Sequence, residues 1–143
     1  MKKPHSQSVI AFVLFLVFLV LVAGLAAAIS VVFAPIKLTL EEEQYTLSFL
    51  FYKEGAAYAE VQEIALLDEE SYSSKRIKSY GGISKELGTY ENDAYGKHVR
   101  MTYSENRHNF ILLRRTDGSI TVFNQKTKDA TSALYEKLAE KLS

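Results

Sequence analysis

The side chains best suited to bind a ligand lie between residues 68 and 97, where basic residues alternate with tyrosines. The candidate ligand-binding residues are Lys75, Arg76, Lys78, Tyr80 and Lys85. Arginine and lysine can hold an anionic head group or a carboxylate, and a tyrosine ring offers a planar surface beside it. Acidic residues in the same stretch largely cancel this positive charge, so a solvated loop without a ligand is the alternative interpretation.

Catalytic and metal-binding chemistry is sparse elsewhere in the chain. There is no cysteine, which excludes disulfides, thiolate catalysis and cysteine-based metal sites. His98 and His108 lack the spacing of a zinc site, and the alternation around His98 predicts a side chain that faces solvent. Ser84 lies near one glycine but lacks the second glycine of a nucleophile elbow. We therefore expect no enzyme activity, no metal site and no cofactor.

The charge balance excludes one class of partner. The chain has 143 residues, enough for about one domain, with Lys+Arg 17 against Asp+Glu 17. From residue 36 onward, 15 basic residues are set against 17 acidic ones. A protein that binds nucleic acid through bulk charge has a clear basic excess. We therefore expect no nucleic-acid partner.

Residues 9–34 predict a transmembrane helix that anchors the protein in a lipid bilayer. These 26 residues carry no charged side chain. A helix of that length spans about 39 Å, more than the ~30 Å hydrocarbon core of a bilayer, and Pro35 predicts its end. A cleaved signal peptide is the alternative, because Lys2 and Lys3 precede the apolar run and the small residues at 26–28 suit cleavage.

We accordingly divide the chain into a short basic tail (1–8), a signal-anchor helix (9–34) and a folded domain (36–143). The lysines of the tail favour a cytoplasmic N-terminus and an extracytoplasmic C-terminal domain, in a single-pass protein of the cell membrane. The connection between helix and domain is nearly absent. We therefore expect the domain to lie close to the bilayer surface.

The pattern from residue 36 onward predicts a mainly β domain that ends in one helix. Apolar–polar alternation predicts strands at 36–40, 45–52 and 99–103, with a weaker one at 64–67. The dipeptide Asp117-Gly118 predicts a two-residue type I′ hairpin that pairs Leu113 with Val122. Residues 127–142 carry one apolar stripe at helical spacing, which predicts an amphipathic helix.

Two further segments are interpreted as surface. Residues 68–97 are rich in Ser, Gly, Tyr and Lys, which predicts a long loop with at most one short strand near Thr89. Loops of this length commonly have a function or are mobile. Arg114 and Arg115, near the end of the predicted hairpin, are expected to be solubility charges on a sheet edge.

Several segments together carry a family resemblance: Ile36-Lys-Leu-Thr-Leu-Glu, Tyr80-Gly-Gly, Tyr95-Gly-Lys and Thr121-Val-Phe-Asn before the final helix. Through them the chain resembles the bacterial PH-like (pleckstrin-homology-like) domain family, whose members are small membrane-anchored proteins largely without assigned activity. The resemblance implies a partly open barrel of two packed antiparallel sheets, capped by the C-terminal α-helix. It also implies a binding scaffold. Eukaryotic phosphoinositide-binding members place basic residues where this chain has Glu41-Glu42-Glu43, which argues against that mode of binding.

The functional expectation is a non-catalytic binding or sensing module that acts near the membrane surface. Its expected partners are the lipid bilayer, through the anchor, and either a membrane protein or an anionic ligand. One alternative is a structural subunit that pairs with other membrane proteins through a sheet edge or the transmembrane helix. The other is a secreted enzyme released by cleavage of the N-terminal segment.

Overall fold

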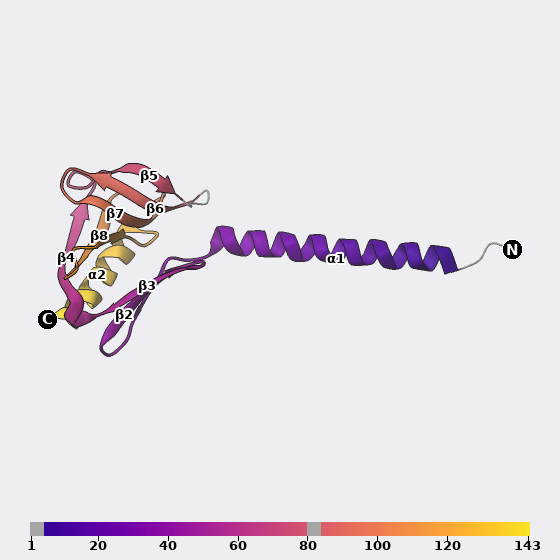
Figure 1. Ribbon diagram of the computed structural model, residues 1–143, viewed down its shortest axis with the longest axis horizontal. Coiled ribbons are helices and arrows are strands. Elements are labelled where there is room, and N and C mark those ends of the chain that lie inside the picture. The colour runs from indigo at the N-terminus through magenta and orange to yellow at the C-terminus, as the bar shows by residue number, and fades with distance from the viewer. Residues whose placement is uncertain (1–4, 80–83) are drawn as a thin grey trace. The chain divides into compact units, whose positions relative to one another are not determined.

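The computed structural model describes residues 5–79 and 84–143, and the chain divides into one compact unit that ends at Ala34 and a second, Pro35–Ser143 (Figure 1). Helix α1 (His5–Phe33) belongs to the first unit. Its segment Ser6–Phe33 has 28 residues and a mean hydropathy of 3.2, so it is long and apolar enough to cross a membrane. The helix begins four residues before the predicted start at residue 9. It ends two residues before Pro35, as expected for a residue that disfavours helix just before it.

The second unit opens with a three-stranded antiparallel sheet. Its strands are β1 (Lys37–Leu40), β2 (Gln44–Phe49) and β3 (Tyr52–Ala57), in the order β1-β2-β3. The single strand predicted at 45–52 is wrong, because the chain turns at Leu50 and Phe51, and Phe49 pairs with Tyr52. Four consecutive large apolar residues from 49 to 52 cannot all face one core, and the turn resolves this conflict.

A six-stranded sheet forms the larger part of the unit. It contains β4 (Val61–Asp68), β5 (Lys75–Ser79), β6 (Lys85–Asn92), β7 (Gly96–Tyr103), β8 (Asn109–Arg115) and β9 (Ile120–Phe123), in the order β4-β8-β9-β7-β6-β5. A short 3₁₀ helix, η1 (Tyr58–Glu60), leads from β3 into β4. The expectation of purely antiparallel sheets is wrong for one pair, because β7 and β9 are parallel. The connection after β7 skips one position in the sheet before β8. Strand β9 then occupies the skipped position, between β8 and β7.

The prediction of a long loop at 68–97 is wrong for most of the stretch, although the short strand predicted near Thr89 lies within β6 (Lys85–Asn92). Strands β5 and β6 occupy much of this stretch and pair with each other, and β6 also pairs with β7 over its whole length. Its Leu87 and Tyr90 are buried. Gly88 and the charged residues of β6 hid the strand in the sequence, because glycine and glutamate are both rare in strands.

The hairpin between β8 and β9 is confirmed, but its predicted register is wrong by one residue. Leu113 pairs with Thr121 instead of Val122. The Arg115 backbone N–H donates to the Ser119 carbonyl oxygen at 2.9 Å, which leaves a three-residue loop. Only Gly118 in this loop has a positive φ (88°), whereas a type I′ turn needs positive φ at both central residues.

Helix α2 (Lys128–Leu142) confirms the predicted C-terminal helix and lies against β8 and β4 (Figure 1). The Thr127 side chain caps it by accepting a hydrogen bond from the Ala130 backbone N–H at 3.1 Å. Leu138 is 0% exposed. Asn106 fixes the first turns of the helix, since its Nδ2 donates to Thr131 Oγ1 at 3.0 Å.

A half-buried polar cluster joins the two sheets. Glu54 on β3 accepts from Arg115 on β8 at 3.3 Å and from Thr121 on β9 at 2.7 Å. The Arg115 guanidinium also donates to the Tyr45 hydroxyl on β2 at 3.0 Å. The expectation that Arg115 is a solubility charge on an edge is therefore wrong. Its side chain is 15% exposed and connects the small sheet to the large one.

Candidate functional site

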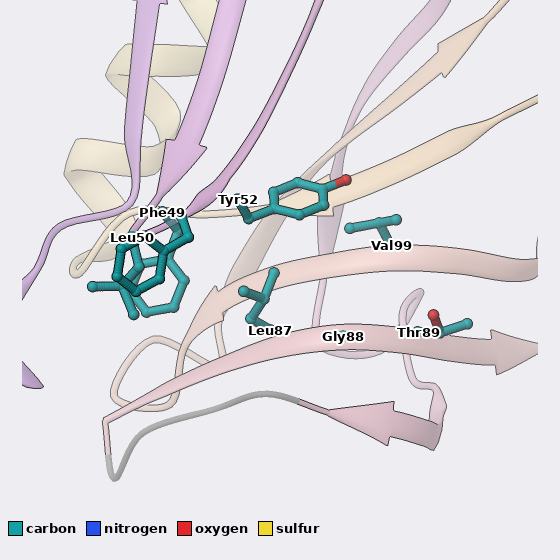
Figure 2. Close-up of a pocket in the computed structure, with 8 residues that line it drawn as sticks. Phe49, Leu50, Tyr52, Leu87, Gly88, Thr89 and Val99 are labelled. Atoms are coloured by element: carbon teal, nitrogen blue, oxygen red, sulfur yellow. The ribbon is translucent and has the colours of Figure 1, made fainter. Parts of the chain in front are cut away.

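An apolar hollow of the second unit lies between the β2–β3 turn and strands β6 and β7, as Figure 2 shows. We call it the hairpin cleft. It has a volume of ≈ 370 Å³, within the usual size of small-molecule sites. Eight residues line it: Phe49, Leu50, Phe51, Tyr52, Leu87, Gly88, Thr89 and Val99.

One wall of the hairpin cleft is the tip of the β2–β3 hairpin. Phe49 is 3% exposed and closes the inner end. Leu50 has a φ of 53°, which is uncommon for a residue with a side chain, and it is 40% exposed. Phe51 is 99% exposed. The tip therefore presents two large apolar side chains to the outside of the domain.

The opposite wall comes from the paired strands β6 and β7. Thr89 pairs with Val99, and Leu87 lies two residues from Thr89, so the three side chains share one face of the sheet. Figure 2 shows Leu87, Thr89 and Val99 on these strands and Tyr52 across the space from Val99. Gly88 lets β5 approach β6 closely, because a Cβ there would overlap the Lys78 carbonyl oxygen.

The hydroxyl of Tyr52, on the hairpin wall of the cleft, is already engaged. The Tyr52 hydroxyl donates to Glu54 Oε2 at 2.7 Å. Burial, this hydrogen bond and the Glu54 charge raise the pKa of Tyr52 well above its ordinary value, so the hydroxyl stays neutral. Within residues 5–79 and 84–143, no group of three or more His, Asp or Glu side chains could hold a metal ion. The cleft can therefore hold an apolar group.

A second hollow, of ≈ 320 Å³, surrounds Arg100 on the other face of β7. The guanidinium lies over the rings of Tyr72, Tyr90 and Phe110, at 5.5, 5.0 and 5.4 Å from their centroids. It also forms an ion pair with Glu86 at 2.8 Å. With its charge balanced and its faces covered by rings, Arg100 has a structural role here.

His98 belongs to the same face as Arg100, and the prediction that it faces solvent is wrong. It is 4% exposed. Its Nδ1 lies 2.8 Å from the Gly96 carbonyl oxygen, so Nδ1 carries the proton and the Tyr72 hydroxyl donates to Nε2 at 2.7 Å. Burial lowers the pKa of His98 below its ordinary value. The segment after β4 places Tyr72 over this face, which the pattern of β7 alone does not reveal.

The structure places three of the predicted ligand-binding residues together on one strand and Lys85 on another. Lys75, Arg76 and Lys78 lie exposed on β5, an edge strand, and Tyr80 lies outside the described residues. Lys85 begins β6 and is 5% exposed, with its Nζ 5.7 Å from the Phe49 ring centroid and 5.3 Å from that of Tyr103. Lys85 lies six positions before Glu91, the partner of Lys75, and this is about 20 Å along a strand.

Lysines on an edge strand discourage pairing with another sheet, and this explains the charges of β5 without a ligand. The cleft residues at the β2–β3 turn were missed as a site. The available signal was the loss of alternation over residues 49–52, where four apolar residues follow one another.

No known family, curated protein or solved structure matches the chain. The likeness to PH-like domains therefore rests on the residues quoted for it.

Proposed function

We propose that the chain is a single-pass, membrane-anchored binding module without catalytic activity, and that its hairpin cleft holds the acyl chain of a membrane lipid. The proposal includes the PH-like fold of the domain and its place on the extracytoplasmic side of the cell membrane. It replaces the basic cluster of β5 with the hairpin cleft as the binding site. The apolar lining of the cleft supports this choice.

The observation that carries the proposal is where the cleft lies in the domain. Lys37 pairs with Ser48, so the chain enters the domain beside Phe49. The Ile36 backbone N–H is fixed there by donating to the Tyr103 hydroxyl at 2.9 Å. Phe33, the last residue of α1, is four residues from Lys37, which is at most about 14 Å of extended chain. A bilayer that holds α1 brings its lipids within reach of the cleft.

The chemistry of the cleft matches an acyl chain. Burial of each methylene group from water contributes about 0.8 kcal/mol, and the engaged Tyr52 hydroxyl and Glu54 carboxylate leave no charge that an apolar chain would have to displace. Tethering to the membrane raises the local concentration of lipid, so weak binding is sufficient for occupancy.

The experiment uses the full chain in vesicles that contain a phospholipid with a photoactivatable diazirine on its acyl chain. After illumination, mass spectrometry maps the crosslinks. We expect crosslinks on peptides containing Phe49–Tyr52 and Leu87–Thr89, in addition to those on α1, which serve as the internal control. Thr89→Phe fills the cleft and is expected to remove the crosslinks on the Leu87–Thr89 peptide, whereas Thr116→Phe, exposed on the β8–β9 loop, is expected to retain them.

Labelling of α1 without labelling of the cleft peptides would contradict the proposal. A crosslinker placed at Leu87 that captures an apolar segment of another membrane protein would also contradict it. That result would favour the alternative of a structural subunit. In the described chain, pairing through the β5 edge is disfavoured by its exposed Lys75, Arg76 and Lys78.

A further inference from the structure

We propose that the tip of the β2–β3 hairpin inserts into the interfacial layer of an anionic bilayer, as a second membrane contact besides α1. The hairpin tip is defined here as Leu50 and Phe51. This inference concerns a surface and does not require a lipid in the hairpin cleft.

Exposure singles out the hairpin tip. Among the described residues from 35 to 143, the exposed large hydrophobic side chains are Leu50 at 40%, Phe51 at 99%, Leu66 at 40% and Ile77 at 48%. Phe51 has by far the highest exposed fraction, and Leu50 is adjacent to it. An aromatic and an aliphatic side chain at one projecting turn suit the boundary between head groups and acyl chains.

The backbone supports the same interpretation. Leu50 takes a φ of 53°, a conformation that glycine or asparagine adopts with less strain. Strain of this kind persists where the surrounding structure enforces it, and it gathers at binding sites. A leucine at this position makes the turn harder to form and adds an apolar side chain to the tip.

Positive charge lies beside the hairpin tip. Lys37 on β1 and Lys53 on β3 both pair with Ser48 on β2, so the three residues form one row across the sheet, separated from the tip by one pair of residues. Both lysine side chains are exposed. Residues opposite one another in antiparallel strands share a face. The two ammonium groups therefore lie on the same face and can contact lipid phosphates together.

The opposite end of the small sheet carries the opposite charge. Glu41, Glu42 and Glu43 form the β1–β2 turn and are exposed. The sheet thus has an apolar, basic end and an acidic end. The chain from α1 enters at the apolar, basic end, because Lys37 begins β1 there. An anionic membrane surface attracts that end and repels the other.

The test exploits the absence of cysteine from the chain. Phe51→Cys and the control Asp117→Cys, at the exposed β8–β9 loop, are each labelled with the environment-sensitive dye NBD in the full chain. The proteins are reconstituted into vesicles of equal amounts of phosphatidylcholine and phosphatidylglycerol. Lipids with a doxyl quencher high on the acyl chain are expected to remove more than half of the emission at position 51 and little at position 117.

Two comparisons separate this inference from the proposed function. Quenching at position 51 is expected to persist when Thr89→Phe fills the cleft, because the dye is quenched by bilayer lipid. Lys37→Glu with Lys53→Glu is expected to reduce the quenching in anionic vesicles but not in pure phosphatidylcholine. The control is Lys97→Glu with Lys141→Glu, at two exposed positions. It is expected to leave the quenching at position 51 unchanged.

A label at position 51 that emits as in water, or that is quenched no more than the label at 117, overturns the inference. Quenching that disappears with Thr89→Phe also overturns it and assigns the signal to lipid in the cleft. Self-quenching between labelled chains without doxyl quenching overturns it in favour of contact with a second copy.

Discussion

At the scale of single residues, His98 links the domain's stability to pH. Its pKa in the folded domain is lowered by burial, while in the unfolded chain it is about 6.5. As the pH falls, the unfolded chain therefore binds the proton first. We expect the free energy of unfolding to decrease as the pH falls below about 6.5. Denaturant titrations of the full chain in detergent, followed by the near-ultraviolet circular dichroism of the tyrosines, measure this.

His98→Gln is expected to flatten that dependence between pH 7 and pH 5, because the group that titrates is gone. His108→Gln is the matched control. His108 is 63% exposed, so this variant controls for the loss of a histidine side chain that is not buried. An unchanged slope in His98→Gln would show that another group controls the dependence.

Gly88 is the residue that permits β5 and β6 to pair closely. A Cβ at this position would overlap backbone atoms of Lys78 and Ser79, which cannot swing aside as a flexible side chain can. We expect Gly88→Ala to lower the free energy of unfolding by about 3 kcal/mol or more. Gly96→Ala meets open space and only the positive φ of 63°, so about 1 kcal/mol is expected. Equal losses would contradict the argument.

Single-residue environments were the least predictable part of the structure. The alternation of β7 places His98 and Arg100 on one face, which the sequence shows, but it does not reveal that Tyr72 covers that face. Likewise, Arg115 is in a strand that ends at an exposed turn, yet Glu54 is 61 residues away in the chain. Contacts over such distances depend on the order of strands, which no local pattern encodes.

At the scale of elements, the ion pair between Glu54 and Arg115 holds the small sheet on the large one. Removal of one partner leaves the other partly buried and uncompensated. We expect Glu54→Ala to lower the free energy of unfolding by about 2–4 kcal/mol. Arg115→Met in the same protein should cost less than it does alone, since the two substitutions share one interaction. Additive effects would show that the sheets are held by apolar packing instead.

Glu63→Ala is the control for that experiment. Glu63 pairs with Arg114 at 3.2 Å, but the two side chains are 51% and 33% exposed. Exposed pairs contribute about 1 kcal/mol or less. The comparison therefore measures what burial adds to an ion pair formed by an arginine of β8.

The elements with strong local signals were predicted well and the others were not. Helix α2 was predicted from its regular apolar stripe, and the helix appears in the structure. The β8–β9 hairpin was predicted, yet Asp117-Gly118 also suits a three-residue loop, and the choice between the two shifted the register. Strand β5 and most of β6 were missed, apart from the short strand predicted near Thr89, because their stability comes from pairing with neighbouring strands and not from their own composition.

At the scale of the whole molecule, the division into an apolar helix and a β-rich domain followed directly from composition. The helix is apolar on every side, and its length and hydropathy are sufficient to cross a membrane. The hairpin cleft was not predicted, because its two walls lie 40 residues or so apart in the chain and meet only when the two sheets pack.

The shortness of the connection between α1 and the domain gives a last prediction. Insertion of a flexible Gly/Ser segment of about 20 residues between Ala34 and Pro35 adds a mean span of roughly 25 Å. This lowers the effective concentration of the hairpin tip at the bilayer. We expect doxyl quenching at the labelled Phe51→Cys position to fall, while the same insertion in the Thr116–Gly118 loop leaves it unchanged. Quenching that is indifferent to the first insertion would show that the tip binds the membrane without help from its tether.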